Sequence, residues 1–438
     1  MKPLRLLLLV VLLLPSAPAA GLPAGRQAGQ GAKRLTLPNG LRIVLKPNLS
    51  TEVVAIDLLL DISAFDEAPE QRGIRSLVQR LLLRGTSLQS GAEMARRLAA
   101  AGGIADTTLS LDYVEIYAIV PADGLELALA LLAEAVQHPA FQPEEIAKQK
   151  LAADQLARSA KEDPFQATYL AFRRALYRDH PYGSPTLGDA RSLAALTRQD
   201  LLDFHARHYR PNRAVLAICG SFGQAQALRA IRPEFSEWIR GDPAPPRQQD
   251  LPSLTCSEVV ARELPVNRAH LLLGFPAPAA NQPGYSALQV LDSILSGGAS
   301  ARLPSALRDR LGLVYDTSSF YPTLAATSHL AIHAVTQPQL LDTVKAAIIE
   351  TLSALSQEPV PPEELTRAKR YLLGSYALSH QRMKDQAYAL AWYEILGLGC
   401  DFGERYADSI QAVTPPDVQQ AAQALLRRFV LAVTMPTV

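Results

Sequence analysis

Cysteine is scarce in this chain, which has three among its 438 residues. Cys219, Cys256 and Cys400 are far apart and form no C-x-x-C pair, so neither a zinc knuckle nor a disulfide framework is expected. One disulfide could form in an oxidising compartment, but the sequence does not select its pair. Cys219 follows the apolar run 214–218, which predicts that it is buried as a small hydrophobic side chain.

An excess of charge is also missing. The 43 Lys and Arg residues are balanced by 42 Asp and Glu residues, for a net charge of +1. This balance provides no general attraction to nucleic acid or to an anionic membrane, and no basic-aromatic motif suggests a nucleic-acid partner. A chain of this length exceeds the size at which a single core keeps growing, so two or more domains are expected.

Long apolar runs are absent beyond the N-terminus. A basic start at residues 1–5 precedes the apolar run 6–14, and small residues follow up to Ala20. This pattern predicts a signal peptide over residues 1–20, and hence a periplasmic or secreted protein with no membrane span in the mature chain. The run is short for a bilayer span, and an uncleaved anchor is the alternative.

The chain contains an internal repeat. Three pairs of segments match in the same order at a nearly constant separation: 143–150 with 362–369, 192–200 with 409–417, and 214–218 with 430–433. A repeat of this length predicts two duplicated domains rather than a short-period solenoid. We expect them at 34–240 and 251–438, joined by the Pro-rich polar linker 241–250.

Local signals predict that each half is α+β, with helices packed on a mainly antiparallel sheet. Pro143 and Pro362, each followed by two Glu residues, are expected to open helices, because Pro suits the first turn and acidic residues favour the positive end of the helix dipole. Thr197 and Thr414, each with Asp three residues later, indicate capping boxes. Strands are expected at 41–45, 53–60, 113–120, 269–275 and 328–334.

The segment 73–86 has the pattern of a helix packed on a core. Apolar residues at 74, 77, 78, 81 and 82 form one stripe, and Gly85 provides a stop signal. The opposite face carries Ser76, Gln79 and Arg80.

This helix and its closing Arg-Gly-Thr resemble the metal helix of the pitrilysin/insulinase family of zinc peptidases. The similarity continues over nearly the whole mature chain, in order, at 37–42, 180–183, 209–212 and 295–303. It implies two homologous halves arranged as a clamshell. The family's motif is H-x-x-E-H, in which two His one turn apart bind zinc and the Glu activates water.

The resemblance also shows what has been replaced. Ser76, Gln79 and Arg80 occupy the three motif positions, and Leu156 occupies the position of the family's third ligand, a Glu. None is a customary zinc ligand, and Arg80 adds a permanent positive charge. Asp154 is the nearest carboxylate and is out of register. We therefore expect no metal and no cofactor in this chain.

Histidines elsewhere offer no clear substitute. His205 and His208 are expected to cap a helix or line its surface, and His329 and His333 to be a packed or exposed pair on one strand face. A self-sufficient peptidase would need such unrecognised ligands.

The second half retains a different family feature. Arg308 and Tyr315, seven residues apart, resemble the Arg/Tyr pair that holds the substrate backbone and stabilises charge on the scissile carbonyl in relatives. By this resemblance both are substrate-binding residues. The alternative is an ordinary Arg at a helix end and a core Tyr.

Loss of the metal helix with retention of the Arg/Tyr pair resembles the family's two-subunit arrangement. It implies a non-catalytic subunit of an exported heterodimeric zinc peptidase. Its expected partners are a catalytic subunit with intact H-x-x-E-H, which would hold the zinc, and peptide substrates. A stand-alone peptide-binding or scaffold protein is the main alternative, and a self-sufficient metallopeptidase is a third.

Overall fold

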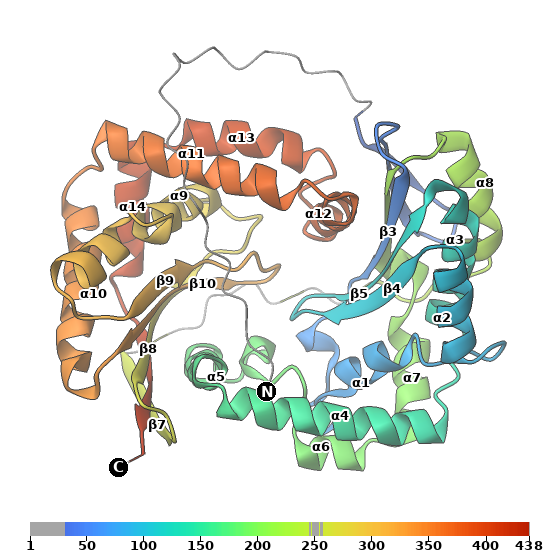
Figure 1. Ribbon diagram of the computed structural model, residues 1–438, viewed down its shortest axis with the longest axis horizontal. Coiled ribbons are helices and arrows are strands. Elements are labelled where there is room, and N and C mark those ends of the chain that lie inside the picture. Colours follow the sequence, from blue (N-terminus) through green and yellow to red (C-terminus); the bar gives the residue numbers. More distant parts are fainter. Residues whose placement is uncertain (1–30, 245–246, 248–253, 255–256, 438) are drawn as a thin grey trace, which may run out of the picture.

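The computed structural model describes residues 31–244, 247, 254 and 257–437. The expected signal peptide 1–20, Cys256 and half of the expected linker 241–250 lie outside this range. Two sheets with their helices make up the molecule (Figure 1). The elements of the first half run from Lys33 to Phe235, and those of the second begin at Glu258.

The first half has a six-stranded sheet in the order β1-β2-β6-β3-β5-β4. Only the pairing of β2 with β6 is parallel. The strands are β1 (Lys33–Thr36), β2 (Arg42–Pro47), β3 (Val53–Leu60), β4 (Ile104–Leu109), β5 (Val114–Pro121) and β6 (Ala214–Gly220). The helices are α1 (Ile74–Leu81), α2 (Gly91–Ala100), α3 (Leu125–Gln137), α4 (Pro143–Glu162), α5 (Pro164–Tyr177), α6 (Ala190–Ala195), α7 (Arg198–His208) and α8 (Gln224–Phe235).

The second half repeats this order in a five-stranded sheet, β7-β11-β8-β10-β9, again with one parallel pair, β11 with β7. Its strands are β7 (Glu258–Leu264), β8 (Ala269–Ala277), β9 (Asp316–Phe320), β10 (Ser328–Thr336) and β11 (Val430–Pro436). Its helices are α9 (Tyr285–Ser296), α10 (Leu341–Gln357), α11 (Pro362–Ser379), α12 (Met383–Ile395), α13 (Phe402–Ala412) and α14 (Pro415–Leu425). The predicted α+β duplication with mainly antiparallel sheets is therefore confirmed.

The central strands are buried on both faces. Every residue of β6 is buried, and so is every residue of β3 after Val53. Such strands read as continuous hydrophobic runs rather than as an alternating pattern, because helices cover both sides of the sheet. Helices of the same half cover one face of each sheet. A helix of the other half covers the opposite face.

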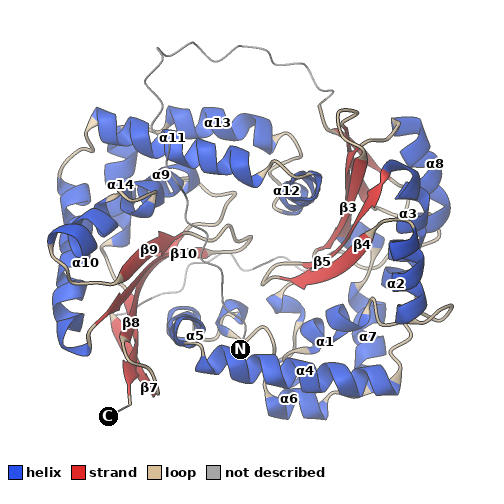
Figure 2. Ribbon diagram, in the orientation of Figure 1, coloured by secondary structure: helices blue, strands red, loops and turns tan. Residues whose placement is uncertain are grey.

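The two halves exchange one helix each. Helix α12 of the second half packs on β2, β3 and β6, whereas α5 of the first half packs on β7, β8 and β11. Both helices lie between the two sheets (Figure 2). Each half therefore completes the core of the other.

Polar contacts fix α12 on the first sheet. Lys384 of α12 forms an ion pair with the buried Glu115, and its ammonium lies 3.9 Å from the carboxylate of Asp57. Burial, together with nearby Glu115, raises the pKa of Asp57 well above its usual range. The hydroxyl groups of Tyr113 and Tyr388 are hydrogen bonded at 2.8 Å.

Close packing and hydroxyl groups fix α5 on the second sheet. The Phe172 ring lies so near Gly274 that a Cβ at that glycine would be 2.3 Å from it. The hydroxyl groups of Thr168 and Thr434 are 2.6 Å apart. His329 is fully buried and is hydrogen bonded to Tyr residues of α5.

The local signals have mixed outcomes. The helix openings at Pro143 and Pro362 and the capping boxes at Thr197 and Thr414 are confirmed. The expected helix 73–86 is too long, because α1 ends at Leu81. The chain beyond it turns into isolated bridges, Gly85 with Ser90 and Thr86 with Pro139, that a longer helix would prevent.

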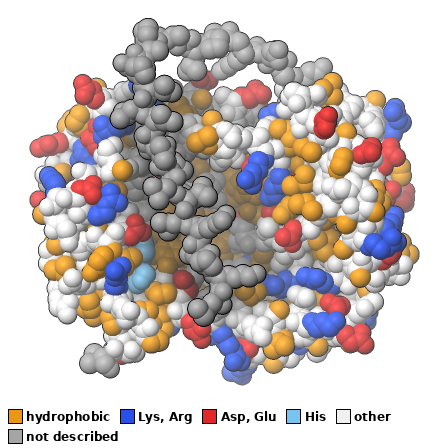
Figure 3. All heavy atoms as spheres, viewed as in Figure 1, with side chains coloured by type: hydrophobic (Ala, Val, Ile, Leu, Met, Phe, Trp, Pro, Cys, Tyr) orange, Lys and Arg blue, Asp and Glu red, His pale blue; other side chains and the backbone are white. Residues whose placement is uncertain are grey.

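Cys219 is fully buried, as predicted, and burial raises the pKa of its thiol to about 12. Cys219 and Cys400 are both free thiols. None of the helices in the described part of the chain is long and apolar enough to cross a bilayer. Acidic and basic side chains are interspersed over the face seen in Figure 3.

Candidate functional site

The start of α1 is held firmly in the first half. Gly73 precedes it with φ of +92°, and a Cβ there would be 2.9 Å from the carbonyl oxygen of Leu187. The Glu67 carboxylate accepts the backbone N–H groups of Gly73 and Arg75 at 3.2 and 3.0 Å. A carboxylate at this position complements the positive end of the helix. The orientation of α1 is therefore fixed.

The two faces of α1 have different surroundings. Ile74, Leu77, Val78 and Leu81 pack in the core of the first half, as the apolar stripe predicted. The other face carries the three motif positions and lies near β4, the edge strand of the first sheet, and α4 (Figure 1).

The three side chains of this face differ in their partners. Ser76 is 1% exposed and its Oγ has no hydrogen-bond partner. The Gln79 amide donates to the hydroxyl of Thr107 on β4. Arg80 is half-buried, and its Nε has no partner. Burial lowers the pKa of Arg80, and the positive charge of Arg84 adds to this effect.

These residues do not fit zinc. A guanidinium group does not act as a ligand, and its positive charge would repel the ion. Gln79, whose amide nitrogen donates to Thr107, could offer only its amide oxygen and Ser76 only a neutral hydroxyl group, and neither is a customary zinc ligand. Among residues 31–244, 247, 254 and 257–437, no three His, Cys, Asp or Glu side chains are placed to hold a metal ion.

Helix α4, which packs against α1, provides no replacement carboxylate. Leu156, at the expected third-ligand position, is 44% exposed. Asp154 instead forms an ion pair of 2.7 Å with Arg158, one turn along the same helix.

The histidines considered as substitutes have structural partners. His205 is half-buried, and its Nε2 is hydrogen bonded at 2.8 Å to the carbonyl of Val136 in the last turn of α3, which fits the helix-capping role that was one of the two expected. His208 lies 3.3 Å from the carboxylate of Asp66. His329 and His333 are packed on one face of β10, and His333 contacts His270 at 3.2 Å.

Arg308 and Tyr315 lie in the second half, on either side of the turn before β9. Arg308 belongs to the helical turn η6 (Pro304–Arg310), is exposed, and donates to the adjacent Asp309 at 2.8 Å. This hydrogen bond raises the pKa of Arg308. Tyr315 is 48% exposed, and its backbone N–H donates to Val335 of β10 at 2.8 Å. Neither side chain has a hydrogen bond or ion pair with α1 among the residues that the structure describes.

Two partners of Tyr315 were not predicted. The guanidinium of Arg268, between β7 and β8, lies 3.6 Å from the centre of the Tyr315 ring. Gln337 donates a long hydrogen bond of 3.5 Å to the phenol oxygen. Arg268 is far from Tyr315 in sequence, so no local pattern could have identified it. These contacts orient the ring and leave the phenol proton available for donation.

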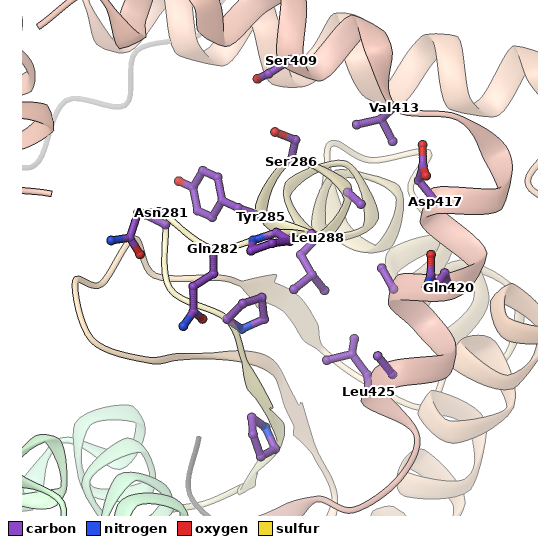
Figure 4. A pocket seen from close by; sticks show the side chains of 18 of the residues that line it. Asn281, Gln282, Tyr285, Ser286, Leu288, Ser409, Val413, Asp417, Gln420 and Leu425 are labelled. Atoms are coloured by element: carbon purple, nitrogen blue, oxygen red, sulfur yellow. The ribbon is translucent and has the colours of Figure 1, made fainter. Parts of the chain in front are cut away.

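A large groove lies elsewhere in the second half. Its volume is about 1430 Å³, and it is bounded by α9, α13, α14 and the loop before α9. Tyr285, Leu288 and Leu425 contribute apolar surface, while Asn281 and Asp417 add polar groups (Figure 4). None of the motif positions or the Arg/Tyr pair lines it.

Two family models match the chain. The model described as Insulinase (Peptidase family M16) matches residues 42–190, and the model described as Peptidase M16 inactive domain matches residues 195–372. Together they span most of the chain. The chain belongs to the insulinase family. Within this family it is a member whose α1 lacks the H-x-x-E-H motif.

Relatives and solved structures agree with this assignment to the insulinase family. An uncharacterized zinc protease of Mycobacterium leprae is 29% identical over 422 residues, covering 94% of this chain and 93% of the relative. One from Bacillus subtilis is 28% identical over 348 residues, covering 79% and 84%.

The fold is shared with two crystal structures at a TM-score of 0.85. One is a protease from Helicobacter pylori, 20% identical, covering 92% of this chain and 99% of that one. The other is a peptidase M16 inactive domain from Pseudomonas fluorescens, 22% identical, covering 93% and 98%. At these identities the likeness establishes the insulinase-family fold alone.

Proposed function

We propose that this chain is the non-catalytic subunit of an exported heterodimeric zinc peptidase. The observation that carries the proposal is the side-chain set on α1, where Ser76, Gln79 and Arg80 replace every residue of the metal motif. Zinc and the water-activating carboxylate would then belong to a partner chain with intact H-x-x-E-H. The apolar run at residues 6–14 supports export.

The contribution of this chain would be substrate binding. Arg308 and Tyr315 are both exposed, and guanidinium and phenol groups are hydrogen-bond donors. Donors aimed at a developing oxyanion lower the barrier to peptide cleavage. Arg308 and Tyr315 would provide such donors to a peptide held between the two subunits.

The sheet edges favour a peptide as the ligand. β4 and β9 are edge strands, and β9 begins directly after Tyr315. An edge strand presents unpaired N–H and C=O groups that can pair with an extended peptide.

Metal analysis and reconstitution test this proposal. The purified chain is expected to contain no stoichiometric zinc and to cleave no peptide, whereas its mixture with a motif-bearing partner cleaves unfolded peptides. One zinc per chain in the isolated protein would contradict the proposal.

Variants of the mixture test the Arg/Tyr pair. Arg308→Ala or Tyr315→Phe is expected to lower kcat by about 100-fold, because each removes a donor to the transition state. Arg310→Ala is the control, since Arg310 is exposed on the same helical turn. Equal activity of the Arg310 and Arg308 variants would exclude a role for Arg308.

A peptide-binding or scaffold protein without a catalytic partner is the second candidate. The ion pair of Arg308 with Asp309 and the stacking of Arg268 on Tyr315 favour it, because both side chains already have partners. In that case the Arg308 and Tyr315 variants keep the biological activity of wild type.

A further inference from the structure

The face of α1 with the three motif positions carries positive charge without a counter-ion. Arg80 lies in the last turn of α1, and the positive charge of Arg84, which follows the end of the helix, acts on it. No ion pair and no hydrogen bond of the Arg80 side chain occurs among the described residues, although its Nε is buried. A half-buried cation in this state lacks the interaction that normally offsets its desolvation.

A second unpartnered donor lies on the same face. Ser76 and Arg80 are four residues apart on α1, so their side chains project from one side of the helix. The Ser76 hydroxyl is buried and has no partner. A buried donor without an acceptor costs free energy, and two such donors together indicate a ligand that provides acceptors.

No carboxylate of the neighbouring elements β4 and α4 pairs with Arg80, and Asp106 of β4 accepts the backbone N–H of Thr107 at 2.8 Å. Gln79 is bound to Thr107, Asp154 of α4 is paired with Arg158, and Leu156 carries no charge. Arg80 therefore has no acidic partner within the described part of the chain.

We propose that this face of α1 is a carboxylate-binding site, in which Arg80 receives a carboxylate of the bound peptide. The inference rests on the proposed function, which provides the peptide. A guanidinium group binds a carboxylate through two parallel hydrogen bonds, which makes it suited to this role. The face that carries a cation-binding motif in the family thus binds an anion in this chain. The carboxylate is either an acidic side chain or the C-terminus of the peptide.

Calorimetric titration of the full chain with three N-acetylated dodecapeptides tests the site. One peptide carries an internal Glu and a C-terminal amide, the second has Gln in place of Glu, and the third has Gln with a free C-terminal carboxylate. We expect one of the two anionic peptides to bind about 10- to 100-fold more tightly than the neutral peptide at low salt. Which of them does so identifies the source of the carboxylate.

Variants locate the effect. Arg80→Gln is expected to abolish the preference, and Arg80→Lys to retain part of it because charge is kept and the planar fork is lost. Arg232→Gln, which removes an exposed charge from α8, is the control and keeps the preference. Arg80→Gln should melt no lower than wild type, because it removes an unpaired charge near Arg84.

The outcomes separate the two proposals. Equal affinity for the three peptides, or an undiminished preference in Arg80→Gln, overturns the carboxylate site while peptide binding stands. Failure of all three peptides to bind overturns peptide binding by this chain as well.

Discussion

A single glycine sets how closely the two halves approach. Gly274 lies inside β8, where glycine usually weakens a strand because it packs nothing. Here it leaves room for the Phe172 ring of α5, which would otherwise meet a Cβ at 2.3 Å. The presence of glycine at position 274 is therefore explained by the packing of α5 against it rather than by the needs of its own strand.

Gly274→Ala should destabilise the protein by about 1–3 kcal/mol, since the added methyl group must displace Phe172 or the helix. Gly374→Ala on the exposed face of α11 is the matched control, with nothing within 4 Å of its new Cβ. It should stabilise by about 1 kcal/mol, because alanine is the better helix former. Urea unfolding measures both, and a Gly274→Ala variant as stable as wild type would refute this packing.

At this scale the sequence is informative where a pattern is local. The i, i+4 spacing of Ser76 and Arg80 placed them on one face of α1, and their positions show the replaced metal motif. The stacking of Arg268 on Tyr315 and the role of Gly274 depend on contacts between distant segments. No spacing rule reveals these contacts.

The exchanged helix α5 depends on a neutral histidine. His329 of β10 accepts or donates one hydrogen bond at each ring nitrogen, to Tyr177 at 2.8 Å and to Tyr169 at 3.1 Å. Burial, with a smaller effect from Arg173, lowers the pKa of His329 to about 3. A protonated imidazole ring has two N–H donors and no acceptor, so it could no longer accept a hydrogen bond from either tyrosine hydroxyl group.

A fall in pH should therefore weaken the packing of α5 on the second sheet. The unfolded chain takes up a proton on this histidine near pH 6.5, whereas the folded chain resists it until about pH 3. Stability from this group is complete above pH 6.5 and is lost as the pH falls toward 3, by at most about 1.4 kcal/mol per pH unit. His329→Gln should reduce this slope in urea unfolding between pH 7 and 4.

The exposed His138 provides the control, since His138→Gln should leave the slope as in wild type. Half-buried His205 and buried His333 have lowered pKa values of about 4 and act in the same direction. The His329 variant should thus flatten the dependence without removing it. An unchanged slope would show that His329 is not neutral in the folded state.

Elements were predicted well where periodicity and caps agree. The strand 53–60 matches β3 residue for residue, and the Thr capping boxes mark the starts of α7 and α14. The end of α1 was misplaced because the Gly85 stop signal competes with bridges to Ser90 and from Thr86 to Pro139. The bridge of Thr86 with Pro139 depends on a segment some fifty residues away, which no local pattern indicates.

In the whole molecule, the exchange of α5 and α12 joins two cores that the repeat alone would make independent. Inner-face residues of the first sheet, among them Val44, Ala55 and Leu59, belong to the same cluster as Leu390 and Trp392 of α12. Neither sheet is covered on both faces without the other half. Unfolding of one half therefore exposes apolar surface of the other half to water.

Calorimetry should accordingly show one unfolding transition, with a van't Hoff enthalpy close to the calorimetric enthalpy. Gly274→Ala, in the second half, should lower this single transition as a whole. Two transitions, only one of them shifted by Gly274→Ala, would show that the halves unfold separately.

The repeat in the sequence was sufficient to predict duplication, the α+β class and the two halves. It could not predict the exchange. α5 and α12 occupy equivalent places in the repeat. Packing of each helix on its own half and packing on the other half are therefore compatible with the same sequence pattern. The choice is made by tertiary contacts such as Phe172 on Gly274 and Lys384 on Glu115.

The exchange has a consequence for synthesis on the ribosome. The last strand of the first sheet ends at Gly220, but the helix that covers its inner face is not complete until Ile395. At about 5–20 residues per second, that surface stays uncovered for on the order of ten seconds or more. The nascent chain thus exposes the apolar inner face of this sheet long before α12 is synthesised. We expect chaperones that bind unfolded chains to bind this surface most strongly during that interval.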